Sequence, residues 1–249
     1  MKKSRKILIG ILICVIIGSV FYIGYYYVTQ NKNEKVYKKL QKEVVKQESK
    51  EEEPQTEESH VEIPIDFAQL QAQNPDIYAW IQIDGTNINY PVAQSATDNE
   101  YYLNHTIEGQ EGYPGSIYTE NWNTKEFTDF NTVIYGRDMK DGSMFADLKQ
   151  YRSEAYFQNH RSIWIYRQGD WQQYVIFSCY TAREEEMGIY QSHFISEEEK
   201  QTYLKSVESK SLYTTGSQPE ITDSLITLST CLGKGKRVIV HAVLLCYTE

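Results

Sequence analysis

The 249-residue chain contains few cysteines. Its cysteines and histidines do not occur in a pattern that would hold a metal ion. Its four cysteines form no C-x-x-C pair and no Cys/His spacing typical of structural zinc. The sequence therefore predicts no metal site, and nothing in it predicts a cofactor. Cys179 and Cys246 lie in apolar runs typical of strands. They could form a disulfide outside the cell, although two buried free thiols are the favoured alternative.

Positive charge is also scarce over most of the chain. The formal net charge is −9, and because the first six residues are strongly basic, residues 61–249 are more acidic than the chain as a whole. Phosphate binding needs a basic surface, so this balance argues against nucleic acid as a partner and against close adhesion to anionic lipid. The sequence also contains no P-loop and no internal repeat.

One long uncharged run lies near the N-terminus, at residues 7–28. A helix of this length spans roughly 33 Å, which is enough to cross a bilayer. The basic residues 1–6 favour a cytoplasmic N-terminus, although lysines after the run make this preference modest. Because the run is too long for a typical cleaved signal peptide, we expect an uncleaved single-pass anchor in the cell membrane.

Residues 29–60 are predicted to link this anchor to a compact domain. They hold seven lysines and eight glutamates, with few apolar residues, so they cannot bury a core, although residues 34–50 could form a transient helix. We therefore expect a cytoplasmic tail at 1–6, a transmembrane anchor at 7–28, a charged linker at 29–60 and one domain at 61–249.

The domain is predicted to be mainly β, with short helices at its periphery. Runs rich in β-branched and aromatic residues are separated by turn residues, with hairpin signals at residues 84–85 and 168–170. A short helix is expected to begin at Asp66, and a capping box at residues 196–199 predicts a longer one. About eight strands without βαβ alternation favour a mostly antiparallel sheet closed into a small barrel.

The most informative stretch is residues 223–245. Apolar runs at 225–228 and 238–245 flank a turn with two glycines, which predicts a strand, a loop and a strand. Cys231 is expected where the first strand ends, and Arg237 where the second begins. A guanidinium within reach of a thiol is what a cysteine nucleophile needs, because the cation stabilises the thiolate. A buried, inert cysteine beside a solvated arginine is the alternative.

Five segments in order resemble those of class B sortases, which are Gram-positive cysteine transpeptidases. They are residues 99–105 (NEYYLNH), 115–117 (GSI), 132–136 (TVIYG), 139–145 (MKDGSMF) and 227–231 (TLSTC). The resemblance runs from about residue 66 to the C-terminus. It implies a closed sortase-type β-barrel with peripheral short helices, preceded by one N-terminal transmembrane helix.

The resemblance also implies acyl transfer outside the cell, facing the cell wall. Family members cleave an Asn-Pro-x-Thr-type sorting signal near the C-terminus of a surface protein, and an amine on a peptidoglycan precursor or a pilin then resolves the thioester. Cys231 would be the nucleophile, and Arg237 would hold the thiolate or the oxyanion of the tetrahedral intermediate. The residues at positions where the family lines its peptide groove are Asn99, Leu103, Tyr135, Thr181 and Ser229.

One position departs from the family pattern. Where the family has the histidine that gives a proton to the departing amine, this chain has Arg137. An arginine stays protonated near neutral pH, so it can stabilise a thiolate but cannot shuttle a proton. His193 or His105 could take over this role, and Asp138 is a weaker candidate. Otherwise the chain is a catalytically impaired, sortase-like peptide-binding module. A cysteine L,D-transpeptidase or a wall hydrolase fits the five segments poorly.

Overall fold

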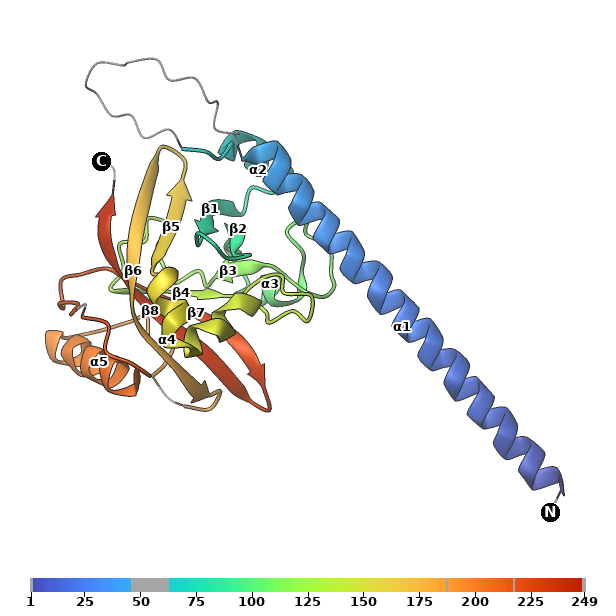
Figure 1. Ribbon diagram of the computed structural model, residues 1–249. Coiled ribbons are helices and arrows are strands. Elements are labelled where there is room, and N and C mark those ends of the chain that lie inside the picture. The colour runs from blue at the N-terminus through green and yellow to red at the C-terminus, as the bar shows by residue number, and fades with distance from the viewer. Residues whose placement is uncertain (1, 46–62, 187, 217, 248–249) are drawn as a thin grey trace. The chain divides into compact units, whose positions relative to one another are not determined.

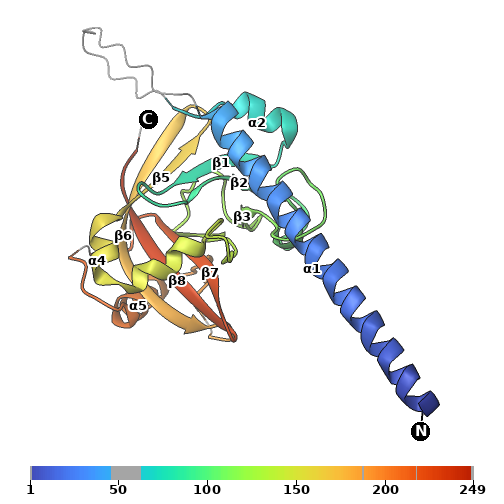
Figure 2. The same ribbon diagram turned by 45° about the vertical axis from the view of Figure 1, so that its right-hand side comes forward.

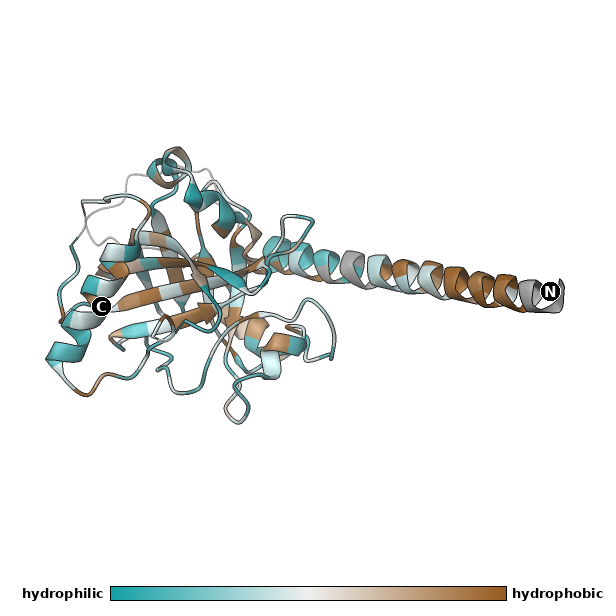
Figure 3. Cartoon of the chain, turned by 90° about the horizontal axis from the view of Figure 1, so that it is seen from below, coloured by the Kyte–Doolittle hydropathy of each residue, from teal (hydrophilic) through white to brown (hydrophobic). Residues whose placement is uncertain are grey.

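The computed structural model describes residues 2–45, 63–186, 188–216 and 218–247 (Figure 1). The chain separates into two compact units, Met1–Lys39 and Leu40–Glu249. The first unit consists of helix α1 (Lys2–Val44), which continues into the second. Within α1, Ile7–Val28 is the one helical segment of the described residues that is long and apolar enough to cross a membrane. Figure 3 shows this hydrophobic half in brown, followed by a more polar half.

The predicted linker is helical at its start, and some of its few apolar residues are buried. Leu40 and Val44 lie one helical turn apart, so they share a face, and both are buried in the second unit. Between them, Gln41 Nε2 donates to the backbone oxygen of Asn89 at 2.7 Å. The second unit therefore begins before the expected boundary at residue 61. Residues 46–60 of the linker lie outside the described residues.

Eight strands of the described chain close into one barrel (Figures 1 and 2), which confirms the predicted fold. In chain order they are β1 (Ile77–Gln82), β2 (Asn89–Ala93), β3 (Ile117–Thr119), β4 (Asn131–Tyr135), β5 (Ser162–Arg167), β6 (Asp170–Arg183), β7 (Leu225–Gly233) and β8 (Lys236–Tyr247). Their order around the barrel is β1-β2-β3-β4-β7-β8-β6-β5. Most neighbours are antiparallel, as predicted, whereas β2 with β3 and β4 with β7 are parallel pairs joined by long connections.

Short helices lie in the connections between the strands. They are α2 (Phe67–Gln73), α3 (Tyr101–Asn104), the 3-10 helix η1 (Ala146–Arg152), α4 (Glu154–Asn159) and α5 (Glu197–Lys210). Both predicted N-caps form: Asp66 Oδ1 accepts from the backbone nitrogen of Gln69 at 3.0 Å, and Ser196 Oγ accepts from that of Glu199 at 3.2 Å.

A buried polar network joins β4, β7 and β8 to α5. His241 is fully buried, with Nδ1 2.9 Å from Thr227 Oγ1 and Nε2 3.1 Å from the Tyr180 hydroxyl. Thr227 donates to Asn131 Oδ1 at 2.7 Å, and Asn131 Nδ2 donates to the Tyr203 hydroxyl at 3.0 Å. Because buried polar groups are costly when unpaired, these bonds fix α5 and the connection before it against the sheet.

The buried His241 is predicted to make the folded chain less stable in acid. Burial, and to a smaller extent the charge of Lys210, lowers the pKa of His241 from 6.5 to about 3. Between these values the unfolded chain binds a proton that the folded chain does not. The free energy of unfolding should therefore fall as the pH drops below 6.5, by about 1.4 kcal/mol per pH unit from this group.

Urea unfolding between pH 4.5 and 7.5 measures this contribution. His241→Gln should flatten the pH dependence below pH 6.5, whereas His193→Gln, a change at an exposed histidine, should leave it as it is. A pH dependence that is the same in His241→Gln as in the unchanged chain would contradict the assignment.

Candidate active site

Cys231 and Arg237 lie directly opposite each other in the β7–β8 hairpin. The expectation that Cys231 marks the end of its strand is wrong, because β7 continues to Gly233 and β8 begins at Lys236. The turn is tight, and its residue Lys234 has a φ of 53°, so the hydrogen-bonded ladder reaches almost to the tip. Side chains opposite each other have their Cβ atoms about 5 Å apart, which brings a guanidinium into contact with a thiol.

Arg237 contacts the thiol and is held in place by a carboxylate. Its Nη1 donates to Cys231 Sγ, and its Nη2 donates to Glu184 Oε1 at 2.6 Å. Burial lowers the pKa of Arg237, but the charges of Cys231, Tyr190 and Glu184 outweigh burial and raise it. The guanidinium is therefore placed where it can hydrogen-bond a negatively charged atom at this position.

These two residues lie in a groove of about 370 Å³. It brings together most of the predicted site residues: Cys231, Arg237, Arg137, Leu103, Tyr135 and Ser229. Asn99 and Thr181 are not among the residues that line it. Asn99 Oδ1 accepts from the backbone nitrogen of Asn121 at 2.6 Å, and Thr181 is exposed on β6. The groove is also lined by residues that were not predicted from the sequence: Pro114, Ser116, Tyr118, Gly136, Glu184, Tyr190 and Thr230.

Three neighbouring strands present one row of side chains to the groove. Tyr118 on β3 pairs with Tyr135 on β4, and Tyr135 pairs with Ser229 on β7, so these side chains point the same way. Arg137 and Cys231 each come two residues after this row, Arg137 just beyond the end of β4 and Cys231 within β7, and both line the groove. The register of the barrel thus places the second guanidinium and the thiol in the same groove.

Tyr190 packs over this row from the connection between β6 and α5. Its hydroxyl lies 2.9 Å from Ser229 Oγ, and its ring centroid lies 5.5 Å from that of Tyr135. Tyr135 in turn donates its hydroxyl proton to Glu120 Oε2 at 2.9 Å. The alternation of side chains along a strand could have indicated from the sequence that Tyr118 faces the groove. Tyr190 lies in an irregular connection, where no periodicity in the sequence indicates the direction of a side chain.

Arg137 is tied to α3 at the wall of the groove. Its Nη2 donates to the backbone oxygen of Leu103 at 2.7 Å and to Asn104 Oδ1 at 3.2 Å. The guanidinium also lies over the ring of Tyr113, 5.3 Å from the centroid. These contacts place a second fixed positive charge in the groove and help to hold Leu103 there.

The other proton donors considered from the sequence lie outside the groove. His105 stacks on Tyr101 with ring centroids 3.8 Å apart, and its Nδ1 lies 2.7 Å from the Tyr101 backbone oxygen. His193 is exposed, and Asp138 forms an ion pair of 2.7 Å with Lys149. Among the residues that the structure describes, the groove is therefore lined by no histidine.

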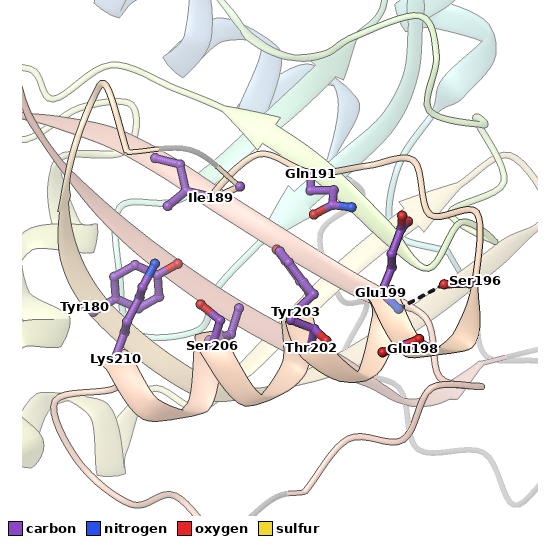
Figure 4. Close-up of a pocket in the computed structure, with 12 residues that line it drawn as sticks. Tyr180, Ile189, Gln191, Ser196, Glu198, Glu199, Thr202, Tyr203, Ser206 and Lys210 are labelled. Carbon is purple, nitrogen blue, oxygen red and sulfur yellow. Dashed lines mark hydrogen bonds between the residues drawn. The ribbon is translucent and has the colours of Figure 1, made fainter.

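A larger cavity of about 560 Å³ lies beside α5 (Figure 4). Ile189 and Gln191, on either side of Tyr190 in the chain, line it together with Tyr203 and Lys210 of α5. None of the residues predicted from the sequence to form the site is among its described lining residues. We therefore place the chemistry in the smaller groove, which holds the thiol and two guanidinium groups.

The other cysteines are free thiols of a different character. Burial raises the pKa of Cys179 to about 12, which leaves this thiol protonated and unreactive. Cys246 donates to Gln173 Oε1 at 3.2 Å and is only half-buried. The two cysteines do not form the disulfide that was considered from the sequence. Among the described residues, no cluster of His, Cys, Asp and Glu is arranged to hold a metal ion.

Comparison with known proteins finds close relatives. The family model of the Sortase domain matches residues 81–245. The chain is 38% identical over 184 residues to sortase B of Listeria monocytogenes, covering 72% of this chain and 74% of that protein. The crystal structure of sortase B from Bacillus anthracis in complex with AAEK1 aligns with a TM-score of 0.74 at 33% identity, covering 88% of this chain and 99% of that one. Clostridium perfringens sortase B aligns with a TM-score of 0.68 at 32% identity, covering 72% and 99%.

The contact between Arg237 and Cys231 predicts how fast the thiol reacts. Arg237→Ala removes the cation that contacts Cys231 Sγ, so alkylation of Cys231 by iodoacetamide at pH 6.5 should slow by about tenfold or more. Peptide mass spectrometry after timed labelling gives the rate at each cysteine. Cys246 serves as the internal reference, because Arg237 does not contact it and its rate should stay constant. Equal rates at Cys231 with and without Arg237 would show that the contact does not activate the thiol.

Proposed function

The chain belongs to the sortase family of cysteine transpeptidases, and from this premise we propose that it cleaves an Asn-Pro-x-Thr-type sorting signal through a thioester on Cys231. The observation that carries the proposal is the hydrogen bond from Arg237 to the Cys231 thiol at a groove lined by strand ends. A paired thiolate is a nucleophile at neutral pH, and the groove gives an extended peptide a place to lie beside it.

In the proposed reaction, the Cys231 thiolate attacks the threonine carbonyl carbon of the sorting signal. The negative charge that develops on the carbonyl oxygen is stabilised by the Arg237 guanidinium, which Glu184 already orients through a hydrogen bond. The C–N bond then breaks and leaves a thioester on Cys231. An amine on a peptidoglycan precursor or on a pilin attacks this thioester, which transfers the surface protein to the acceptor.

The groove residues are proposed to bind the peptide on both sides of the scissile bond. Leu103 offers an apolar surface, and Tyr135 and Ser229 lie in the row of side chains next to Cys231. Asn99 and Thr181 would contact only a peptide that extends beyond the groove.

We propose that Ile7–Val28 anchors the enzyme in the cell membrane, with residues 1–6 in the cytoplasm and the barrel facing the cell wall. The basic tail before the span and the apolar helix itself support this orientation. Surface proteins and wall amines are both available on that side.

Arg137 supports a second candidate, a sortase-like module that binds the sorting signal but turns it over poorly. Its guanidinium is engaged by Leu103 and Asn104, and it cannot give a proton to a leaving amine near neutral pH. General acid catalysis is typically worth about 10² to 10⁴ in rate, so its loss would leave a slow enzyme or a binding protein.

Arg137→His separates the two candidates. Restoring an imidazole should raise kcat/KM for cleavage of an Asn-Pro-x-Thr reporter peptide by at least about 10²-fold. Cys231→Ala should abolish cleavage in either background.

Because Arg137 also contacts α3, Asn104→Ala is the matched control. It removes one of these contacts and keeps the groove cation, and it should not raise activity. Fast cleavage by the unchanged chain together with slower cleavage by Arg137→His would mean that arginine is the productive residue at this position.

A further inference from the structure

Cleavage of the amide at Cys231 needs a proton donor in the groove. The amine leaves only if its nitrogen takes up a proton as the C–N bond breaks. Arg137 and Arg237 stay charged near neutral pH, and Glu184 accepts a hydrogen bond from Arg237. The remaining candidates are the phenol hydroxyls of the tyrosines that line the groove, Tyr118, Tyr135 and Tyr190.

Two of these phenols are poorly suited to give up a proton. Tyr135 already donates to the Glu120 carboxylate at 2.9 Å. Burial raises the pKa of both Tyr118 and Tyr135, and the negative charge of Glu120 raises it further, while the charges of Arg137 and Arg237 act in the opposite direction on Tyr118. Their phenolates would form beside a carboxylate, which is unfavourable.

Tyr190 differs because its hydroxyl lies against Ser229, a neutral group, and the charge of Arg237 also acts on it. Burial, together with the charge of Glu184, raises the pKa of Tyr190, and the hydrogen bond with Ser229 and the charge and hydrogen bond of Arg237 offset part of this rise. Arg237 would therefore stabilise a phenolate at Tyr190.

The position of Tyr190 suits the leaving nitrogen. Ser229 and Cys231 are alternate residues of β7, so they lie about 7 Å apart on one face of the strand. In the intermediate, Sγ is bonded to the carbonyl carbon, and the leaving nitrogen on that carbon would be hydrogen-bonded to the phenol oxygen. The path from Sγ to the phenol oxygen is then two covalent bonds and one hydrogen bond long, or about 5–6 Å. The Tyr190 hydroxyl lies 2.9 Å from Ser229 Oγ, so it lies over the same face of β7 as the Cys231 side chain, where the leaving nitrogen would be.

The connection that carries Tyr190 is also fixed from its other side. Ile189 and Gln191 line the cavity beside α5 (Figure 4). Tyr190, between them in the chain, lines the groove. Asn131, which is fully buried, donates from Nδ2 to the Gln191 backbone oxygen at 2.8 Å. The same asparagine accepts a hydrogen bond from Thr227 in the buried network, so the connection is held by the barrel itself.

We propose that Tyr190 is the general acid and base of this chain, in place of the histidine that Arg137 replaces; the inference rests on the proposed thioester chemistry. As the tetrahedral intermediate collapses, the C–N electron pair takes the Tyr190 hydroxyl proton, and the amine leaves neutral. The phenolate, paired with Arg237, then takes a proton from the incoming amine. As that nitrogen bonds to the carbonyl carbon, the C–S bond breaks and the Cys231 thiolate is restored. A phenol is a weaker acid than an imidazolium, so this route is slower than one through histidine.

The dependence on the leaving group tests this role. Tyr190→Phe removes the proton and keeps the ring. The full chain in detergent is given two substrates with the same Asn-Pro-x-Thr sequence, one a peptide amide and one a 4-nitrophenyl ester, whose leaving group departs without a proton. Single-turnover acylation of Cys231 is followed by mass spectrometry. Tyr190→Phe should slow acylation by the amide by about 10²-fold and acylation by the ester by no more than about threefold.

The outcomes separate the inference from the function on which it rests. Equal losses on both substrates, or no loss on the amide, would overturn the role of Tyr190, because a residue that only shapes the groove affects both substrates alike. An ester that fails to acylate Cys231 in the unchanged chain would overturn the proposed function itself. Tyr166→Phe on β5, outside the groove, is the matched control and should change neither rate.

A second arm uses the Arg137→His background. Tyr190→Phe lowers the rate of acylation by the amide. With an imidazole restored at position 137, this fold-decrease in rate should be a tenth or less of the fold-decrease measured when residue 137 is arginine. A loss of the same size in both backgrounds would also overturn the proposal, because it would show that Tyr190 does not share its role with the histidine.

Discussion

The attraction between the Cys231 thiol and the Arg237 guanidinium is the interaction on which the site depends. It exists because β7 and β8 pair in a register that places these residues opposite each other. In a closed barrel every strand is hydrogen-bonded on both sides, so this register cannot slip without moving a whole set of side chains to the other face. Glu184 fixes the second edge of the guanidinium, which leaves the first edge for sulfur or for a developing oxyanion.

The remaining groove residues adjust what this pair can do. Two fixed guanidinium groups, Arg237 and Arg137, make the groove favourable for anions, which suits the thiolate and the tetrahedral intermediate. The same charges make it unfavourable for a cationic acid such as an imidazolium. A phenol is neutral and becomes an anion when it gives up its proton, so it is better suited to the positive electrostatic potential of these two guanidinium groups. An arginine at position 137, where the resemblance predicts a histidine, therefore changes which kind of proton donor the groove can accommodate.

Much of this architecture could be predicted from the sequence, because the relevant signals are local. Turn residues between β-branched runs predicted the barrel, Asp66 and Ser196 marked helix starts, and the TLSTC segment with Arg237 identified the central pair. The strand ends around Cys231 were placed too early because their residues are polar at the mouth of the barrel, where the apolar pattern stops.

Other features depend on tertiary contacts that no local pattern encodes. Leu40 and Val44 are isolated apolar residues in a charged stretch, and only the surface of the domain determines that they are buried. Tyr190 enters the groove because Asn131 holds the next residue from the opposite side, across a long separation in sequence. Asn99 and Thr181 were assigned from the resemblance alone, and the local path of the chain leaves them outside the groove lining.

Trapping the acyl-enzyme tests the central claim most directly. The chain would be mixed with a sorting-signal peptide, quenched in acid within one turnover and digested, and the adduct located by mass spectrometry. The account predicts a mass increase equal to the acyl half of the peptide, on Cys231 and lost on treatment with hydroxylamine, as expected for a thioester. Cleavage of the peptide without an adduct on Cys231, or with the adduct on another residue, would contradict it.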